Sequence, residues 1–330
     1  MLSNRLPSAA LTALVLPWAG WAGVRAAGAD RGFPLTPALA LTPYAAGTSL
    51  LPLAAALAAR SRPATVLAAA SAAVLGATAL HRLREQPAAR PAAARPLTVV
   101  SLNMLHGRAD AEATVALADA AGADVLTLME VTPEAVGRLL DAGVADRLPH
   151  GHVVPAGEGQ PAGAGGALWT RLEVAHRSVL PGRFGQPVAR LVVPGAPDVE
   201  VTAVHTHPPV RSTRSVRRWA EELRLLPEPG GEVLRVLAGD FNATVDHSAF
   251  RRLLAAGWVD AGLATGRAWR STWQPERLPE PRLTLDHVLA DPRIGVRSFD
   301  VVRVPGSDHR ALVAELLVPL DGPVEVAAGT

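Results

Sequence analysis

Asp240 and Asn242 end an apolar segment, LRVLAGDFN at residues 234–242, which has the composition of a β-strand. Side chains alternate along an extended chain, so these two residues face the same way while Phe241 faces the core. Gly239 predicts a sharp turn before the acid. A carboxylate beside an amide suits phosphoryl transfer, because the carboxylate can orient or deprotonate water while the amide holds a phosphate oxygen. A strand-to-loop turn capped by Asp and Asn has the same pattern.

Polar side chains also lie at the ends of five other apolar segments, where a packed core gains nothing from them. These are 98–104 with Asn103, 124–130 with Glu130, 199–207 with His205 and His207, 283–289 with Asp286 and His287, and the turn GSDHR at 306–310 with Asp308 and His309, ahead of a strand at 311–318. Active sites of layered α/β proteins gather at strand ends. The pattern therefore favours chemistry over simple capping.

The ordered motifs SLNM, LME, HTH, GDFN, LDHVL and SDHR resemble those of the endonuclease/exonuclease/phosphatase superfamily, whose members hydrolyse phosphate esters with a divalent metal. The resemblance covers residues 97 to 318, and chance rarely supplies six short motifs in the right order. It implies an α/β fold, a four-layered sandwich of two mixed sheets packed face to face with helices outside. It also implies a metal-dependent phosphoric ester hydrolase that uses Mg²⁺ or Mn²⁺.

The same resemblance implies a metal-binding group. Glu130 matches the principal metal ligand, because a hard divalent ion prefers carboxylate oxygen. Asn103 matches the supporting amide beside that metal, and Asp308 matches a second carboxylate near it.

The remaining matched residues would act on the water and the phosphate. Asp240 would orient or deprotonate the attacking water, and Asn242 would fix the phosphoryl group. His309 would stabilise the charge of the transition state, with Asp286 holding its imidazole in orientation. His205 matches the other histidine on the phosphate side.

Two positions depart from the family pattern. Met129 stands before Glu130 where a Gln is usual, and the single tyrosine, Tyr44, lies in the apolar amino-terminal region, away from any nuclease-type site. These departures argue against abasic-site DNA repair more than against hydrolysis. Caps or ordinary hydrogen-bonding roles are favoured for His207, His287 and Asp246.

Composition narrows the classes of function. With 330 residues and 49% apolar content, the chain can bury a sizeable core. It has no cysteine, which excludes disulfides, thiolate metal sites and a cysteine nucleophile. All 32 basic residues are arginine, so the pI near 10.1 overstates a net charge of only +2.

The charge is unevenly distributed. Residues 1–96 carry nine arginines and two acidic residues, a net charge of +7, whereas residues 97–330 carry 23 arginines and 28 acidic residues, a net charge of −5. Proteins hold long duplex DNA through several basic phosphate contacts. The acidic balance therefore favours a small or lipid-linked phosphate ester over nucleic acid.

The amino-terminal region predicts membrane attachment. Residues 6–24, 35–59 and 64–80 are uncharged stretches of roughly spanning length, which predict a bundle of about three transmembrane helices. Two spans, or a signal peptide cleaved near residues 27–29, are the alternatives. The predicted organisation is a transmembrane region at 1–81, a Pro/Ala/Arg-rich linker at 82–96, a catalytic domain at 97–320 and a tail at 321–330.

The side of the membrane stays open. With three spans, six arginines of the region lie on the side of the catalytic domain and three on the other, which favours a cytoplasmic domain. Three spans, a linker and this domain also resemble actinobacterial membrane proteins of the VanJ teicoplanin-resistance type, which implies an extracytoplasmic domain. Either way the predicted partner is the lipid bilayer of the cell membrane, and no obligate protein partner is implied.

Residues 211–226 predict an amphipathic helix with arginines crowded at its start, among them Arg211 and Arg214. Cations at a helix amino terminus oppose the helix dipole, so a bound anion such as a substrate pyrophosphate would explain them. An arginine-rich solvated face balanced by Glu221 and Glu222 is the favoured alternative.

These observations combine into one predicted function, a membrane-anchored metal-dependent phosphoesterase acting on a phosphate or pyrophosphate ester. The preferred substrate is lipid-linked, of the undecaprenyl pyrophosphate kind. A membrane-anchored nuclease is the first alternative, and it requires a basic groove and salt-sensitive DNA cleavage. A non-catalytic membrane scaffold is the second alternative, but a scaffold has no need to keep one set of polar residues together, namely Asn103, Glu130, Asp240, Asn242, Asp286 and His309.

Overall fold

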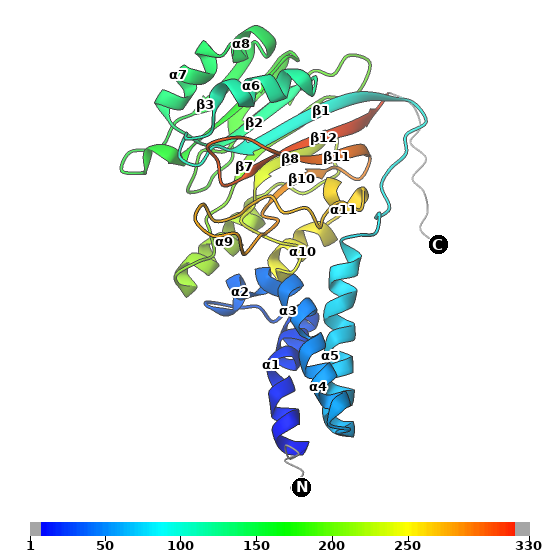
Figure 1. The fold of residues 1–330 in the computed structure, drawn as a ribbon. Helices are drawn as coiled ribbons and strands as arrows, with labels where there is room; N and C mark the ends of the chain where they lie inside the picture. Colours follow the sequence, from blue (N-terminus) through cyan, green and yellow to red (C-terminus); the bar gives the residue numbers. More distant parts are fainter. Residues whose placement is uncertain (1–7, 321–330) are drawn as a thin grey trace.

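The structure, a computed structural model, describes residues 8–320. The first two residues of the predicted span at 6–24 and the predicted tail at 321–330 lie outside the described residues. The amino-terminal part is helical, and we call residues 8–81 the stalk (Figure 1). Its elements are α1 (Ser8–Ala27), α2 (Leu35–Ala38), the 3₁₀ helix η1 (Leu39–Leu41), α3 (Thr42–Thr48), α4 (Leu50–Ala58) and α5 (Arg62–His81).

The long helices of the stalk lie side by side. The helices α1 and α5 have 20 residues each, and therefore a length of about 30 Å. The hydroxyls of Ser8 and Ser61 are 2.8 Å apart at the far end of the stalk, while Arg25 and Arg82 both pair with Asp246 at the other end. The helices α1 and α5 thus run in the same direction, towards the rest of the chain, and α3 and α4 run back between them.

The stalk supports the membrane prediction only in part. Among the described residues, two segments are long and apolar enough to cross a membrane, Leu35–Ala58 and Arg62–His81. The predicted bundle of three transmembrane helices is not confirmed, because α1 does not meet this criterion. Its proline, two tryptophans and Arg25 reduce its apolar character.

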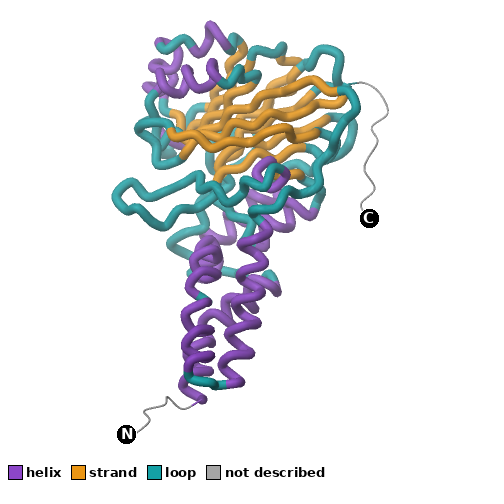
Figure 2. The backbone as a smooth tube through the Cα atoms, turned by 45° about the vertical axis from the view of Figure 1, so that its right-hand side comes forward, coloured by secondary structure: helices purple, strands orange, loops and turns teal. Residues whose placement is uncertain are grey.

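Residues 94–319 form two six-stranded sheets with helices on both outer faces (Figures 1 and 2). The first sheet has the order β11-β12-β1-β2-β4-β3, and the second has the order β5-β6-β7-β8-β10-β9. The strands are β1 (Ala94–Asn103), β2 (Val125–Val131), β3 (His150–Val154), β4 (Gly165–Thr170), β5 (Val174–Val179), β6 (Pro187–Leu191), β7 (Val199–His205), β8 (Leu234–Asp240), β9 (Val259–Asp260), β10 (Asp286–Ala290), β11 (Gly295–Arg303) and β12 (Arg310–Pro319). Each sheet is mixed, because β1 with β2 and β7 with β8 are parallel pairs among antiparallel ones.

Three apolar clusters hold these layers together. One lies between the sheets and includes Val99, Val201 and Val236, and the other two lie between each sheet and its helices. The helices are α6 (Ala111–Ala120), α7 (Pro133–Asp141), α8 (Val144–Arg147), the 3₁₀ helix η2 (Ala162–Ala164), α9 (Thr213–Leu225), α10 (Ser248–Ala255) and α11 (Ala261–Ala264). The predicted four-layered α/β sandwich is confirmed.

Residues 82–93 are packed against the sandwich and do not extend away from it. The backbone N–H of Gln86 donates to the carbonyl of Leu263 at 2.9 Å, and Ala89 pairs with Gly295. The strand β1 already begins at Ala94, inside the segment predicted to be a linker. The sandwich therefore rests directly on the stalk.

A buried polar network joins the two parts. Asp246 accepts hydrogen bonds from Arg25 Nε at 2.8 Å and from Arg82, which bind it from α1 and from the end of α5. Asp30 accepts from the backbone N–H of Ser248 at 3.0 Å, and His247 Nε2 donates to the Thr36 carbonyl at 2.9 Å. These contacts fix the orientation of the catalytic domain on the stalk.

Acidification should weaken this network through His247. Burial lowers the pKa of His247 to about 4, whereas the unfolded chain binds the proton near the usual 6.5. The unfolded state then binds more protons between these values, so stability is lost as the pH falls from 6.5 towards 4, by roughly 2 kcal/mol at pH 5. We expect the stability difference between the wild type and His247→Gln to shrink from pH 7.5 to pH 5 in detergent-solubilised protein. A difference that does not change with pH contradicts the prediction, and titrations shared by both proteins cancel.

Gly239 lies inside β8 and does not form the predicted turn. A Cβ at this position would be 2.1 Å from the carbonyl oxygen of Val204 on β7, so the glycine permits a close approach of two backbones. Gly239→Ala should therefore destabilise the protein by roughly 3 kcal/mol, measured by urea unfolding. The matched control is Gly137→Ala in α7, where a Cβ meets nothing within 4 Å, and there stability should stay equal or rise. Equal stability of both variants would contradict the prediction.

Candidate active site

Strand ends from both sheets converge on one edge of the sandwich. Asn103 ends β1 and Glu130 lies near the end of the parallel strand β2, while His205 and Asp240 end the parallel pair β7 and β8. Asp286 begins the antiparallel strand β10 directly opposite Asp240. Parallel strands bring their carboxyl ends to the same edge, and the antiparallel neighbour contributes its first residue there.

Asn103 connects the two sheets at this edge. Its Nδ2 donates to Glu130 Oε1 at 3.0 Å and to Asp240 Oδ2 at 3.1 Å. Its Oδ1 accepts from the backbone N–H of Leu105 at 2.9 Å, which fixes the orientation of the amide. Asn103 is fully buried, so one amide holds two carboxylates from different sheets at a set distance.

A histidine–carboxylate pair lies beside Asp240. His309 Nδ1 donates to Asp286 Oδ2 at 2.9 Å, and Asp286 Oδ2 also accepts from the Thr272 hydroxyl at 2.6 Å. This leaves His309 Nε2 directed at Asp240 Oδ2, 3.8 Å away. The imidazole is therefore oriented through one nitrogen and presents the other to the site.

His205 completes the buried wall. Its Nε2 lies 3.8 Å from Glu130 Oε1 and 3.9 Å from Asp240 Oδ2, and its ring stacks on Phe184 with centroids 4.2 Å apart. Burial lowers the pKa of His205 to about 4. His205 is thus neutral near pH 7.

Asn242 and Asp308 border the same centre. The backbone N–H of Asn242 donates to Asp240 Oδ1 at 2.8 Å, and its Nδ2 donates to the Thr206 carbonyl at 2.9 Å. Asp308 Oδ2 accepts from Trp273 Nε1 at 2.9 Å, and its Oδ1 lies 4.0 Å from His309 Nε2. Every matched residue of the six motifs therefore lies in one cluster.

Glu130 reaches the cluster through a distorted backbone. Its φ is 55°, in the left-handed region that residues with a Cβ seldom adopt, and the pairing of β2 with β4 shifts register between Met129 and Val131. Such a bulge redirects a side chain and is common beside active sites. Two hydrogen bonds hold the carboxylate, from Asn103 and from the backbone N–H of His106 at 2.8 Å.

Burial and neighbouring charges shift the pKa values of three groups in the cluster, His309, Asp240 and Glu130. Burial alone would lower the pKa of His309, but Asp286 and Asp240 outweigh it and raise the pKa to about 10. Burial and the Asp286 carboxylate raise the pKa of Asp240 to about 7. Burial opposes ionisation of Glu130, yet the nearby His205 imidazole and the hydrogen bonds from Asn103 and His106 lower its pKa.

The chain matches a known protein family. The sequence profile of the Endonuclease/Exonuclease/phosphatase family matches residues 100–309, which is more than half of the chain. The chain belongs to the endonuclease/exonuclease/phosphatase family. It is therefore an enzyme, a hydrolase of phosphoric esters, and the scaffold alternative is set aside.

Solved structures of this family share the fold. An endonuclease/exonuclease/phosphatase from Beutenbergia cavernae is 22% identical, with a TM-score of 0.55 over 68% of this chain and 72% of that chain. Humanised TDP2 from D. rerio is 17% identical, with a TM-score of 0.53 over 67% of this chain and 98% of that chain. An endonuclease/exonuclease/phosphatase from Bacteroides vulgatus is 16% identical, with a TM-score of 0.51 over 68% of this chain and 99% of that chain. No curated protein sequence matches the chain.

Members of the endonuclease/exonuclease/phosphatase family use divalent metal ions, and the side chains here fit one. The cluster contains four carboxylates, of Glu130, Asp240, Asp286 and Asp308, and the His309 imidazole lies within 4.0 Å of the last three. Among the described residues, Asp308 Oδ1 is buried without a hydrogen-bond partner. Ligand atoms of Asp240, Asp286 and His309 lie within 4.8 Å of one another, but the His309 to Asp286 hydrogen bond explains much of that closeness. A hard cation would balance the excess negative charge.

The sequence patterns did not identify several residues that hold the side chains of this cluster in place. Thr272 and Trp273 hold Asp286 and Asp308 from the irregular segment between α11 and β10. Ser307 donates to the Asn103 carbonyl at 2.7 Å and accepts from the backbone N–H of His309 at 3.0 Å. His106 Nδ1 lies 3.1 Å from Glu130 Oε2. The histidine in the motif MLHG, three residues after Asn103, was the only available signal.

The two arginines predicted to bind substrate lie apart from these contacts. Arg211 precedes α9, which begins at Thr213 and not at residue 211, and Arg214 is in its first turn. Within residues 8–320, neither forms a hydrogen bond or ion pair with a side chain of the cluster. The first turn of α9 instead contacts the stalk, where Thr213 Oγ1 accepts from the backbone N–H of Phe33 at 3.3 Å.

Two further polar residues, His287 and Asp246, have ordinary structural contacts, whereas His207 is hydrogen-bonded only through its backbone in the part of the chain that the structure describes. His287 Nδ1 lies 2.7 Å from Asp260 Oδ2, and its Nε2 lies 3.0 Å from the Ala243 carbonyl, on the side of β10 away from the cluster. Asp246 binds the stalk arginines. His207 receives no side-chain partner at its buried Nδ1 within the described residues, and its backbone N–H donates to Glu222 at 2.6 Å.

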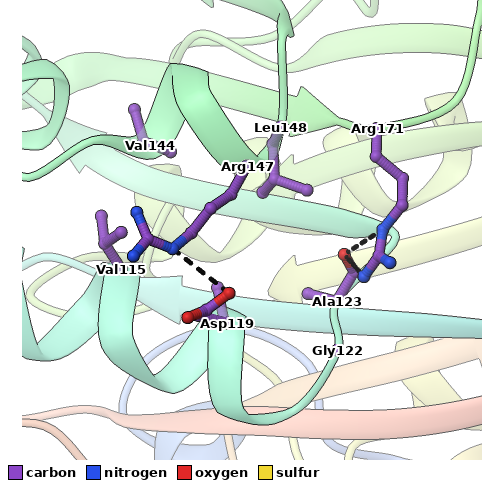
Figure 3. A pocket seen from close by; sticks show the side chains of 9 residues that line it. Val115, Asp119, Gly122, Ala123, Val144, Arg147, Leu148 and Arg171 are labelled. Carbon is purple, nitrogen blue, oxygen red and sulfur yellow. Dashed lines mark hydrogen bonds and ion pairs between the residues drawn. The ribbon is translucent and has the colours of Figure 1, made fainter.

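A surface hollow elsewhere on the sandwich has no part in this site. It lies between α6, α8 and the start of β2, and Figure 3 shows Arg147 paired with Asp119 and Arg171 bound to the Ala123 carbonyl across it. The Arg147 to Asp119 distance is 3.2 Å. Its arginines are already partnered, and β2 separates it from the carboxyl-end edge where the cluster lies.

Proposed function

We propose that this protein is a membrane-anchored phosphoesterase that uses Mg²⁺ or Mn²⁺ to hydrolyse a phosphate or pyrophosphate ester of a membrane lipid. One observation carries the proposal, the short chain segment that connects the polar cluster to the contact with the apolar helical stalk. His247, which binds the stalk at Thr36, follows Asp240 by only seven positions in the chain. Even fully extended, that segment spans at most ~25 Å.

Glu130, Asn103 and Asp308 are the proposed metal-binding residues. Glu130 has a left-handed backbone conformation. Asp308 has a buried carboxylate oxygen that has no hydrogen-bond partner among the described residues. The ion would supply charge neutralisation for the phosphate oxygens. Asn103 would hold Glu130 and Asp240 at the spacing seen here.

Asp240 is the proposed general base. Its Oδ1 is occupied by the Asn242 backbone N–H, and its Oδ2 points to His309 and Asn103, so a water bound at Oδ2 is held on one side of the site. A carboxylate whose pKa is about 7 suits proton removal near neutral pH.

His309, Asn242 and His205 are proposed to face the phosphate. His309 is protonated near neutral pH, so its Nε2–H would donate to a phosphate oxygen while Asp286 holds Nδ1. The Nδ2 of Asn242 donates one hydrogen bond to the Thr206 carbonyl. The backbone of Asn242 is in the left-handed region, at φ 47°, and its side chain is proposed to lie at the edge of the site. Neutral His205 would donate a hydrogen bond without adding charge.

The stalk supports the choice of a lipid-linked substrate. Large apolar side chains on its surface are exposed, for example Leu51 at 68% and Val66 at 70%. Burial of this surface in a bilayer is favourable. Confinement of the site to the bilayer surface raises the effective concentration of a lipid headgroup.

The proposed topology is three helical passes with an extracytoplasmic catalytic domain, as in proteins of the VanJ type. The antiparallel arrangement of α1, α3–α4 and α5 supports an odd number of passes. The arginine distribution favours the opposite, cytoplasmic side. Because the chain has no cysteine, a single cysteine introduced at exposed Arg177 can be labelled in whole cells by a membrane-impermeant maleimide, and labelling without lysis supports the outward side.

The proposed activity is tested by phosphate release from undecaprenyl pyrophosphate by the detergent-solubilised full-length protein with Mg²⁺ or Mn²⁺. We expect release that EDTA abolishes. DNA and RNA are assayed in parallel, at low and high salt. Cleavage of nucleic acid without release from the lipid would contradict the proposal.

A nuclease is the second candidate, since a family neighbour, D. rerio TDP2, is described in complex with a single-strand DNA product. The net charge of −5 over residues 97–330 argues against it.

A further inference from the structure

A second polar cavity lies at the junction of the stalk and the catalytic domain, separate from the cluster described above. Its volume is about 600 Å³, and five arginines line it together with Tyr44 of α3. The arginines are Arg82, Arg270, Arg282, Arg303 and Arg310. We call this space the arginine cavity. None of the residues proposed to act on substrate lines it.

The positive charge in the arginine cavity is only partly balanced. Within residues 8–320, Arg82, Arg270 and Arg282 pair with carboxylates, whereas Arg303 and Arg310 have none within 4.0 Å. Arg310 Nη1 donates instead to the Ser271 hydroxyl at 2.6 Å. Burial lowers the pKa of the Arg310 guanidinium, and the nearby charges of Arg282 and Arg303 lower it further. The side chains therefore repel one another unless an anion enters.

One lining side chain is both buried and unsatisfied. Arg82 is 6% exposed, and its Nε has no hydrogen-bond partner among the described residues. A buried N–H without an acceptor is destabilising, so an acceptor that enters the cavity would be favoured. Phosphate oxygens are strong acceptors for guanidinium groups, which bind them through paired N–H bonds. The cavity thus offers both charge and donors to a phosphate.

An apolar groove on the stalk continues from the arginine cavity. Trp18, Trp21 and Leu41 line it, and Tyr44 lines both spaces. The Tyr44 hydroxyl accepts from the backbone N–H of Arg282 at 2.8 Å, in the loop between α11 and β10 that is orange in Figure 1. Trp269, 58% exposed, lies at the rim of the cavity. Tryptophan and tyrosine are typical of the membrane–water boundary.

We propose that the arginine cavity and this groove together bind an anionic phospholipid of the surrounding bilayer, with the phosphate among the arginines and an acyl chain along the tryptophans. The continuity of a cationic cavity with an apolar groove selects a ligand that has both a phosphate and a chain. The bound lipid would fix the height and tilt of the catalytic domain. This inference rests on the proposed membrane attachment, but not on the proposed substrate.

The arginine cavity and the polar cluster lie on opposite sides of one wall, so a lipid in the cavity would not be in the position of a substrate. Neighbouring residues of a strand face opposite sides, and His309 points to the cluster while Arg310 points to the arginine cavity. Thr272 likewise binds Asp286, and Ser271 lines the cavity. The two sites therefore share a wall and do not share a space.

The test is lipid binding by the full-length protein in detergent, followed by native mass spectrometry. The probes are phosphatidylglycerol, phosphatidylcholine and inorganic phosphate, and Asp240→Asn is measured alongside the wild type so that binding is scored without turnover. We expect phosphatidylglycerol to bind at least about tenfold more tightly than phosphatidylcholine. Inorganic phosphate that binds as tightly as phosphatidylglycerol would overturn the proposal of a lipid.

Variants locate the binding. Arg282→Gln with Arg303→Gln should weaken phosphatidylglycerol binding by about tenfold or more, and Arg303→Gln alone, at an exposed position, should weaken it in the same direction. The control is Arg95→Gln with Arg177→Gln, two exposed arginines on β1 and β5 outside the cavity, and binding should be unchanged. Equal binding by both double variants would overturn the inference, whether or not lipid pyrophosphate is hydrolysed.

Discussion

Asp240→Asn is expected to lower turnover on the order of 10³-fold, because the substitution removes the proposed base and keeps the shape of the side chain. Asn242 and Asn103 each place a hydrogen-bond donor on the present carboxylate, at 2.8 and 3.1 Å. An amide can accept the first bond, but it cannot take a proton from water. The measurement is the single-turnover rate of phosphate release at saturating metal.

The control for this prediction is Asp124→Asn. Asp124 precedes β2, at the opposite end of that strand from Glu130, and accepts from the backbone N–H of Thr98 at 2.7 Å. The same chemical change there should leave turnover within a few-fold of the wild type. If Asp240→Asn also stays within a few-fold, the proposed base is wrong. Metal affinity should be retained in Asp240→Asn, which separates this role from that of Glu130.

Glu130→Gln is expected to raise the concentration of Mg²⁺ needed for half-maximal activity by about 100-fold or more, because loss of a direct metal ligand should cost at least as much as loss of an outer partner, which costs about 10- to 100-fold. The amide has lost the charge that a hard dication prefers. The left-handed backbone at φ 55° and the hydrogen bond from His106 should hold the new side chain in the same place. Activity is titrated with Mg²⁺, and binding of Mn²⁺ is measured by calorimetry.

The control for the metal prediction is Glu134→Gln in the first turn of α7, four residues along the chain and outside the cluster. It should leave the Mg²⁺ requirement unchanged. Saturating metal should restore much of the activity of Glu130→Gln but none of the activity of Asp240→Asn. If Glu130→Gln needs the same Mg²⁺ concentration as the wild type, the metal is bound by other residues, such as Asp240, Asp286 and His309.

Much of the sandwich was predictable because its signals are local. Apolar runs of strand length predicted β1, β2, β7 and β8 to within a few residues. The same strand ends supplied the residues of the cluster. Strand ends are readable from the sequence because an apolar run stops there and a polar side chain begins.

Less of the geometry of the site was predictable. The bulge that turns Glu130 inward depends on the pairing of β2 with β4, and no residue type signals it. Thr272 and Trp273 lie in an irregular segment without periodicity, so nothing local identifies them as partners of Asp286 and Asp308. Gly239 was identified as a turn residue, whereas the neighbouring strand decides its role.

The sequence by itself determined the family, the sandwich and the residues that lie together in the polar cluster, because six motifs and the strand pattern are properties of short segments. Only the tertiary structure decided how the catalytic domain sits on the stalk. Arg25 binds Asp246 across 221 positions of the chain, and Arg82 binds the same carboxylate from the predicted linker. Tertiary structure also created the arginine cavity. A pairing of distant charges depends on the three-dimensional path of the chain, which no local pattern records.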